Sequence, residues 1–253
     1  MDDVVATLVC LHALGGSRRA FDALTHELAG QFDVLALDLP GSGEAPVELG
    51  TSVQEMADHV VRQVPALLGG SREWVLLGHG AGGKVASVVT AQAVAGDLPV
   101  PSGVVLLAAS PPGPEPMAEE QRARMLSWVA DGAMDAAAVT EFVATRVGGP
   151  LGLAEAERVV ADLLRTSPAA WRDWLERGSR EDWSQRVGVL DVPALVVAGG
   201  ADPDLGEDVQ RRLNGAVYPR ATFRTLAGAG HLLPLERPRE VAAVLRASRP
   251  ART

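Results

Sequence analysis

The chain has 253 residues, of which 47% are hydrophobic and 22% charged, and its formal net charge is −9. This composition is typical of a soluble globular protein with one domain and an insertion, and it excludes disordered and collagen-like chains. The negative charge, together with the lack of a basic stripe with interleaved aromatic residues, argues against nucleic-acid binding.

The amino-terminal segment has no recognisable targeting signal. Met1, Asp2 and Asp3 precede a short apolar run that ends at Leu11, with no basic region, no cleavage signature and no apolar run of about 18 residues. We therefore expect a cytoplasmic protein without a membrane partner. The single cysteine, Cys10, lies in this run and is expected to be a small core residue.

Six short apolar runs along the chain are predicted to be strands. They cover residues 4–11, 32–37, 74–77, 104–109, 194–198 and 222–226. The runs are continuous rather than alternating, as expected for a parallel sheet with helices on both faces. Segments with helical spacing lie between or after them, at residues 21–28, 53–68, 85–94, 209–213 and 241–245. This alternation predicts an α/β fold with a doubly wound, mostly parallel sheet.

One interval, residues 111–186, contains no convincing strand. A segment rich in proline and glycine leads into several amphipathic helical stretches, so we predict a helical lid at 111–186 inserted into a core formed by 1–110 and 187–253. Tryptophans concentrate in this lid, and Trp128, Trp171 and Trp174 are candidates for binding an apolar substrate. The alternative is that these rings pack the lid helices together.

A glycine-rich loop, residues 78–84, follows the third predicted strand and fits three motifs. As a dinucleotide-binding fingerprint it lacks the ribose-binding acid, because Asp97 precedes the next strand instead of ending it. As a phosphate-binding P-loop it has Val85 where a hydroxyl is needed. Lys84 would hold phosphates in that case, but we favour an exposed cation in the first turns of a helix.

The third motif is the nucleophile elbow G-x-S-x-G, a sharp turn from strand to helix. Residues 78–82 match it with Gly80 at the position of the nucleophilic serine. The loop alone does not distinguish the three motifs, so the rest of the chain decides.

Four further segments resemble the α/β-hydrolase family, and the resemblance runs from about Thr7 to Leu245. Residues 11–17 look like its H-G-x-x-G-S loop with Ala13 in place of the usual glycine; residues 38–43, 199–203 and 228–238 are similar to its D-x-P-G-x-G turn, acid turn and histidine loop. The resemblance implies an α/β-hydrolase fold in which the backbone N–H groups of Leu14 and Ala81 form an oxyanion hole.

Asp202 and His231 follow successive predicted strands, so both side chains are expected at the carboxyl edge of the sheet, where open α/β folds bind ligands. A carboxylate that holds one imidazole nitrogen leaves the other free to act as a general base. We therefore predict a catalytic dyad of these two residues. Asp204 is a weaker candidate for the acid, and His12 and His79 are expected to shape loops.

Gly80 has no side chain, so an acyl-enzyme cannot form at this residue and the usual serine-esterase mechanism cannot operate. The chain could be an inactivated mutant of a serine hydrolase, a natural enzyme in which His231 activates water or moves protons, or a non-catalytic scaffold. Ser110 and Ser42 are less favoured as replacement nucleophiles, because loop serines usually cap or solvate turns.

These residues favour an enzyme that acts on a small, largely apolar carbonyl compound, an ester or a lactone, without a cofactor or a metal ion. The alternatives are a lyase, cyclase or isomerase of the same fold, and a ligand-binding protein such as a sensor or a nucleotide binder.

Overall fold

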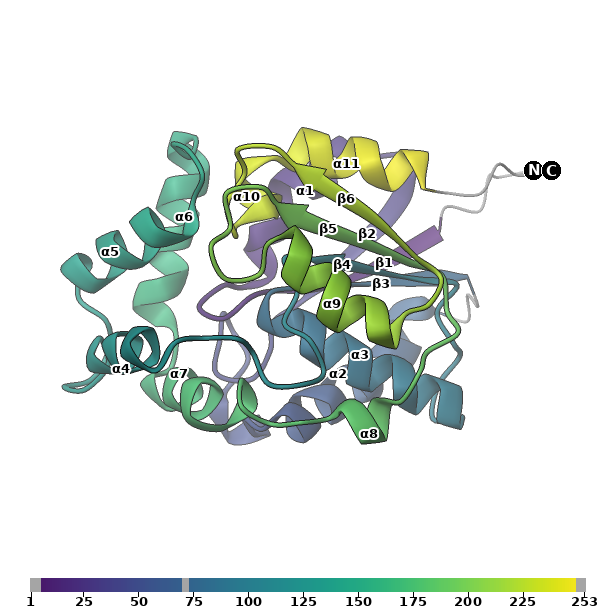
Figure 1. Cartoon of the computed structure of the whole chain (residues 1–253), viewed down its shortest axis with the longest axis horizontal. Coiled ribbons are helices and arrows are strands. Elements are labelled where there is room, and N and C mark those ends of the chain that lie inside the picture. The colour runs from purple at the N-terminus through teal and green to yellow at the C-terminus, as the bar shows by residue number, and fades with distance from the viewer. Residues whose placement is uncertain (1–5, 70–72, 249–253) are drawn as a thin grey trace.

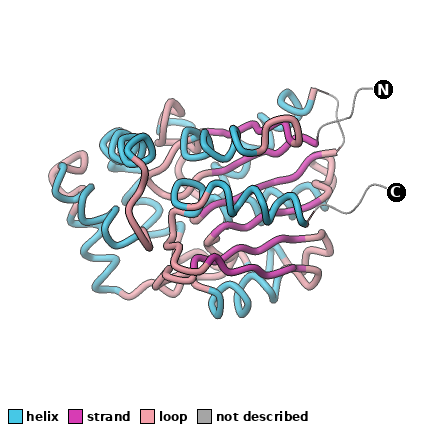
Figure 2. The backbone as a smooth tube through the Cα atoms, turned by 90° about the horizontal axis from the view of Figure 1, so that it is seen from above, coloured by secondary structure: helices cyan, strands magenta, loops and turns pink. Residues whose placement is uncertain are grey.

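The structure, a computed structural model, describes residues 6–69 and 73–248. Its centre is a six-stranded parallel sheet in the order β2-β1-β3-β4-β5-β6 (Figures 1 and 2). The strands are β1 (Ala6–Leu11), β2 (Phe32–Leu37), β3 (Trp74–His79), β4 (Gly103–Leu107), β5 (Ala194–Gly199) and β6 (Ala221–Leu226). The predicted doubly wound parallel sheet is therefore confirmed.

Helices cover both faces of the sheet, as the continuous apolar runs predict. On one face α1 (Asp22–Glu27) packs against α11 (Pro238–Ala247); the other face carries α2 (Val53–Leu68), α3 (Ala81–Ala95) and α9 (Glu207–Val217) (Figure 1). The strands β1 and β5 are buried along their whole length, whereas the edge strands β2 and β6 are partly exposed. Three short elements lie in loops: η1 (Arg18–Phe21), η2 (Val47–Leu49) and α10 (Leu233–Glu236).

The strand ends differ slightly from the prediction. Strand β3 continues to His79, two residues further than expected, and β4 ends at Leu107, because Ala108 has a φ of 41° and leaves the extended conformation. Val4 and Val5, which the sequence assigns to the first strand, lie outside the described residues.

Between β4 and β5 the chain forms helices only, and we call residues 108–193 the helical insertion. Figure 1 shows α4 to α7 beyond the carboxyl ends of the strands, away from both termini. Its elements are α4 (Glu119–Ser127), α5 (Ala136–Arg146), α6 (Leu153–Arg165), α7 (Pro168–Asp173), the π-helix η3 (Trp174–Gly178) and α8 (Ser184–Val187). The last of these, α8, contacts α3 beneath the core.

The environment of Lys84 differs from the expected one. The sequence favours an exposed cation, but Lys84 is completely buried in α3. Its Nζ donates to the backbone carbonyl oxygens of Gly178 at 2.8 Å and Glu181 at 3.0 Å, because the helical insertion returns along this side of α3. Burial lowers the pKa of Lys84 to about 8, against the opposing effect of nearby carboxylates.

In the described part of the chain, no helix combines the length and the apolar character that crossing a membrane requires.

Candidate active site

The carboxyl edge of the sheet brings Asp202 and His231 together. Asp202 lies in the loop after β5, and His231 in the loop after the neighbouring strand β6. The Nδ1 atom of His231 is 2.9 Å from Oδ2 of Asp202, whose side chain is fully buried. The pair lies at the place where the sequence predicts a dyad.

The environment of Asp202 favours its ionised form. Burial of the carboxyl group raises its pKa, but the charge and hydrogen bond of His231 and the N–H groups of Asp204 and Leu205 outweigh this effect. Together they lower the pKa of Asp202 to about 2. At neutral pH the carboxylate therefore accepts the proton on Nδ1 of His231, and Nε2 is left to accept a proton from another group.

The loop that carries His231 is fixed by backbone hydrogen bonds to two other parts of the chain. The N–H group of His231 donates to the carbonyl oxygen of Arg146 at the end of α5, with a distance of 2.7 Å. The carbonyl oxygen of His231 accepts a 2.8 Å hydrogen bond from Nε2 of His79. The Glu236 carboxylate accepts from the N–H group of Gly230 at 2.9 Å. The imidazole is thus positioned by the core and the helical insertion together.

The other two histidines near the site have structural contacts, as the sequence suggests. Burial and the neighbouring His231 lower the pKa of His79 to about 3, so its ring is neutral. The Nε2 atom of His12 accepts from the N–H group of Leu39 at 2.9 Å, which ties the loop after β1 to the loop after β2.

Gly80 forms the turn between β3 and α3, with φ 50° and ψ −122°. Such a backbone conformation is strained for residues with a side chain and is characteristic of a nucleophile elbow. A Cβ atom placed on Gly80 would lie 3.0 Å from Nε2 of His231. The free nitrogen of the imidazole therefore faces the position that a side chain of residue 80 would occupy.

Two backbone donors lie beside this position. Leu14 and Ala81 both line the cavity next to His231. The N–H groups of these two residues have no hydrogen-bond acceptor among the described residues. An oxyanion hole needs two such free donors at the edge of a cavity.

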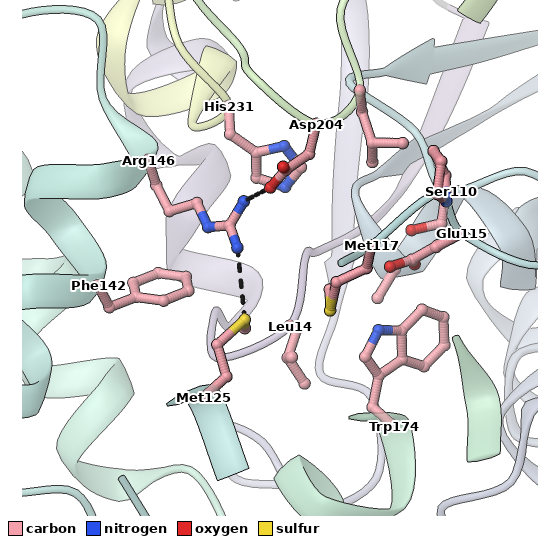
Figure 3. A pocket seen from close by; sticks show the side chains of 13 residues that line it. Leu14, Ser110, Glu115, Met117, Met125, Phe142, Arg146, Trp174, Asp204 and His231 are labelled. Carbon is pink, nitrogen blue, oxygen red and sulfur yellow. Dashed lines mark hydrogen bonds and ion pairs between the residues drawn. The ribbon is translucent and has the colours of Figure 1, made fainter. Parts of the chain in front are cut away.

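The cavity above Gly80 is small and largely apolar (Figure 3). Its volume is about 50 Å³, room for very few water molecules. Ser110 lies on its wall, whereas Ser42 does not contribute to it. Its lining includes the apolar side chains of Leu14, Met117, Met125, Phe142 and Trp174, and the polar ones of Ser110, Glu115, Arg146, Asp204 and His231.

The three tryptophans predicted to bind substrate separate into two groups. Trp174 lines the cavity, with its ring beside Met117 and Glu115 (Figure 3). Trp128 and Trp171 do not line it, which corrects the expectation for these two residues. Their ring centroids lie 6.3 Å apart, and both rings contact Phe142, so they pack the helices of the insertion together.

Sequence reasoning missed two charged residues of the cavity. Arg146 forms an ion pair with Asp204, so Asp204 is occupied and does not serve as the acid of the dyad (Figure 3). Glu115 points into the same cavity from the segment after β4. A carboxylate shortly after a strand, at the carboxyl edge of the sheet, was the available sign for Glu115.

Across the described residues, no group of three or more histidine, cysteine, aspartate or glutamate side chains is arranged to hold a metal ion.

A parallel sheet with a glycine elbow after its third strand, an acid after its fifth and a histidine after its sixth defines an α/β-hydrolase. The chain belongs to the alpha/beta hydrolase family, whose model matches residues 8–244. The predicted fold and the prediction of a hydrolase-type enzyme are confirmed at the level of this family.

Among characterised relatives, the chain is similar to the pimeloyl-[acyl-carrier protein] methyl ester esterase of Neisseria meningitidis serogroup A. The two are 29% identical over 230 residues, which cover 85% of this chain and 69% of the esterase.

Solved structures with little sequence identity share the fold. An esterase from Exiguobacterium antarcticum superposes with a TM-score of 0.81 at 16% identity, and a bromoperoxidase from Bacillus anthracis with 0.82 at 17%. Each alignment covers 96% of this chain and 91% of the other. Because proteins with different activities share this fold, the superpositions establish architecture alone.

Proposed function

We propose that this protein hydrolyses a small carboxylic ester by direct attack of water, with His231 as the general base and Asp202 as the residue that orients it. The observation that carries the proposal is the direction of His231 Nε2, which lies 3.0 Å from the Cβ position of Gly80. Two free backbone N–H groups, of Leu14 and Ala81, lie at the same cavity.

The esterase from Neisseria supports an ester as the substrate, because its name describes the hydrolysis of a methyl ester. The cavity supports a compact reacting group, since it is small and lined mainly by apolar side chains.

In the proposed reaction, the ester carbonyl oxygen accepts hydrogen bonds from Leu14 and Ala81. His231 Nε2 removes a proton from water while the water oxygen bonds to the carbonyl carbon, and the resulting oxyanion is stabilised by the two N–H groups. Collapse of this intermediate breaks the bond to the alcohol oxygen, and the imidazolium returns its proton to that oxygen. No covalent bond to the protein forms.

The surroundings of Gly80 support a route without serine. A Cβ atom on Gly80 would lie only 2.7 Å from the Cβ atom of Ala13, in addition to the 3.0 Å approach to His231. The methyl group of Ala13 thus occupies part of the space that a serine needs, and it cannot rotate away, whereas the approach of Nε2 is compatible with a serine–histidine pair. This crowding argues against a serine hydrolase inactivated by a single substitution.

We also propose that the helical insertion acts as a lid, with boundaries at 111–186 and a core of 1–110 and 187–253. Trp174 supports this role, because it extends from the insertion into the wall of the cavity. Cytoplasmic location remains part of the proposal.

Hydrolysis of short-chain 4-nitrophenyl esters tests the proposed function. His231→Ala is expected to lower kcat by about 10²–10⁴-fold, because general-base catalysis contributes a factor of this size. Asp202→Asn is expected to lower kcat as well, since it removes the charge that stabilises the imidazolium. The matched controls, His26→Ala and Asp208→Asn, change exposed residues and should leave kcat unaltered. Equal turnover by all five proteins would refute the dyad.

A further inference from the structure

Glu115 is a carboxylic acid in the cavity that the proposed reaction does not use. Its backbone is fixed, since the N–H group of Glu115 donates to the carbonyl oxygen of Ser179 at 2.8 Å. Its side chain extends into the cavity that also contains His231 (Figure 3). The Oε1 atom is buried and has no hydrogen-bond partner within residues 6–69 and 73–248.

A buried carboxyl oxygen without a partner destabilises the folded state, so it calls for an explanation. Burial raises the pKa of Glu115, while the charge of Lys84 and a hydrogen bond with Ser110 act in the opposite direction. Lys84 does not satisfy Oε1, because its ammonium group donates to the backbone carbonyl oxygens of Gly178 and Glu181 instead. Oε1 thus keeps an unused hydrogen-bonding capacity in a residue that lines the cavity.

The other side chains of the cavity do not offer an alternative partner. Arg146 and Asp204 form an ion pair with each other, and His231 is engaged with Asp202. Ser110 lies beside Glu115 and interacts with its carboxyl group, yet Oε1 has no partner in the described part of the chain, and the wall next to it also contains apolar groups such as Met117 and the ring of Trp174. A wholly apolar substrate would cover Oε1 and leave it unsatisfied.

We propose that Glu115 forms a second polar subsite, which binds a hydroxyl group of the substrate, so that the preferred substrate is a hydroxy ester. A hydroxyl group both donates and accepts hydrogen bonds, and it therefore matches a carboxyl group in either protonation state. A second carboxylate would be repelled by ionised Glu115. A substrate ammonium group would be repelled by Lys84 and would lose its hydration in an apolar cavity.

This inference rests on the proposed function, because it places the ester group of the same substrate beside Leu14 and Ala81. The test compares ethyl butanoate, ethyl 3-hydroxybutanoate and ethyl 3-aminobutanoate as probes. Their dissociation constants are measured by ligand-observed NMR with the wild-type protein, Glu115→Gln and Glu115→Leu. Glu120→Leu, a change at an exposed glutamate, is the matched control.

The wild-type protein should bind the hydroxy ester about five- to tenfold more tightly than ethyl butanoate, which is the effect of one net hydrogen bond. Glu115→Gln should retain this preference, since an amide also donates and accepts. Glu115→Leu should lose it, and its melting temperature should be no lower than that of the wild type. Glu120→Leu should behave like the wild type.

Four results would each refute the subsite. The wild type could bind ethyl butanoate and the hydroxy ester equally well, or the preference for the hydroxy ester could survive Glu115→Leu. The amino ester could bind more tightly than the hydroxy ester, or the hydroxy ester could fail to bind. Turnover separates this inference from the proposed function. Selective binding without hydrolysis would refute the hydrolytic function and retain the subsite. Hydrolysis of both esters with equal KM, lost in His231→Ala, would refute the subsite and retain the function.

Discussion

At the scale of single residues, the site is defined by what surrounds Gly80. The glycine has the backbone conformation of an elbow, yet its Cβ position is bounded by the methyl group of Ala13 and by Nε2 of His231. Protein interiors tolerate an added atom poorly where neighbours cannot move. We therefore expect positions 13 and 80 to be coupled, so that a serine at residue 80 also requires a smaller residue 13.

This coupling predicts the behaviour of a double-mutant cycle. Gly80→Ser alone should lower the free energy of unfolding by about 1–3 kcal/mol, the usual cost of overpacking, and should react slowly with a fluorophosphonate. Adding Ala13→Gly removes the methyl group, so it should recover part of the lost stability and speed labelling of residue 80. Thermal unfolding and mass spectrometry measure the two effects. Additive stabilities, with equal labelling of Gly80→Ser and the double variant, would show that the positions are independent.

At the scale of secondary structure elements, Lys84 connects the core to the helical insertion. It is the only lysine in the chain and lies in the first turns of α3. Its ammonium group donates to the backbone at the last residue of the π-helix η3 and just after it. The ring of Trp174, the first residue of η3, is 5.8 Å from Nζ of Lys84. The same side chain thus supports the element that contributes a tryptophan to the cavity.

A single lysine permits a direct titration. In protein labelled with ¹⁵N-lysine, the side chain of Lys84 should titrate near pH 8, because burial lowers its pKa to about 8. The unfolded chain has the ordinary lysine value of about 10.4. Between these two values the unfolded state binds a proton that the folded state lacks, so this group adds stability as the pH rises.

The unfolding free energy of the wild type should therefore increase by about 2–3 kcal/mol between about pH 8 and pH 10. In Lys84→Met this increase should be absent. Urea unfolding of both proteins at pH 7.5 and pH 10 measures the difference. An unperturbed titration near pH 10.4, or the same pH dependence in both proteins, would contradict the burial of this ammonium group.

The elements that sequence patterns predict well are those governed by local periodicity. The apolar runs gave the six strands with ends within a few residues, and the positions of Asp202 and His231 followed from the strands that precede them. The environments of Lys84 and Glu115 could not be predicted in this way, because they depend on contacts between distant parts of the chain. Lys84 lies at the start of a helix, where a charged side chain is normally exposed. Its side chain is buried by contacts with residues about 95 positions further along the chain.

The cavity wall was harder to predict for the same reason. The spacing of residues along a helix does not show which part of the chain will pack against each face of that helix. The sequence therefore could not show that Trp174 lines the cavity while Trp128 and Trp171 pack between helices. Arg146 lies at the carboxyl end of α5, and its part in the cavity depends on how the insertion folds back over the sheet.

At the scale of the whole molecule, the helical insertion closes the carboxyl edge of the sheet. Arg146 at the end of α5 contacts both Asp204 of the core and, through its carbonyl oxygen, the His231 loop. The cavity there is only about 50 Å³, so we expect the insertion to move outward when an ester larger than a few atoms binds.

The proposed mechanism hydrolyses an ester at this site without an acyl-enzyme. Rapid quenching during steady-state turnover of a 4-nitrophenyl ester, followed by peptide mass spectrometry of the whole chain, would detect any acylated residue. We expect hydrolysis that depends on His231 and no acylated residue at any time. An acyl group on Ser110, Ser42 or another side chain, formed and lost at the rate of turnover, would refute direct attack by water.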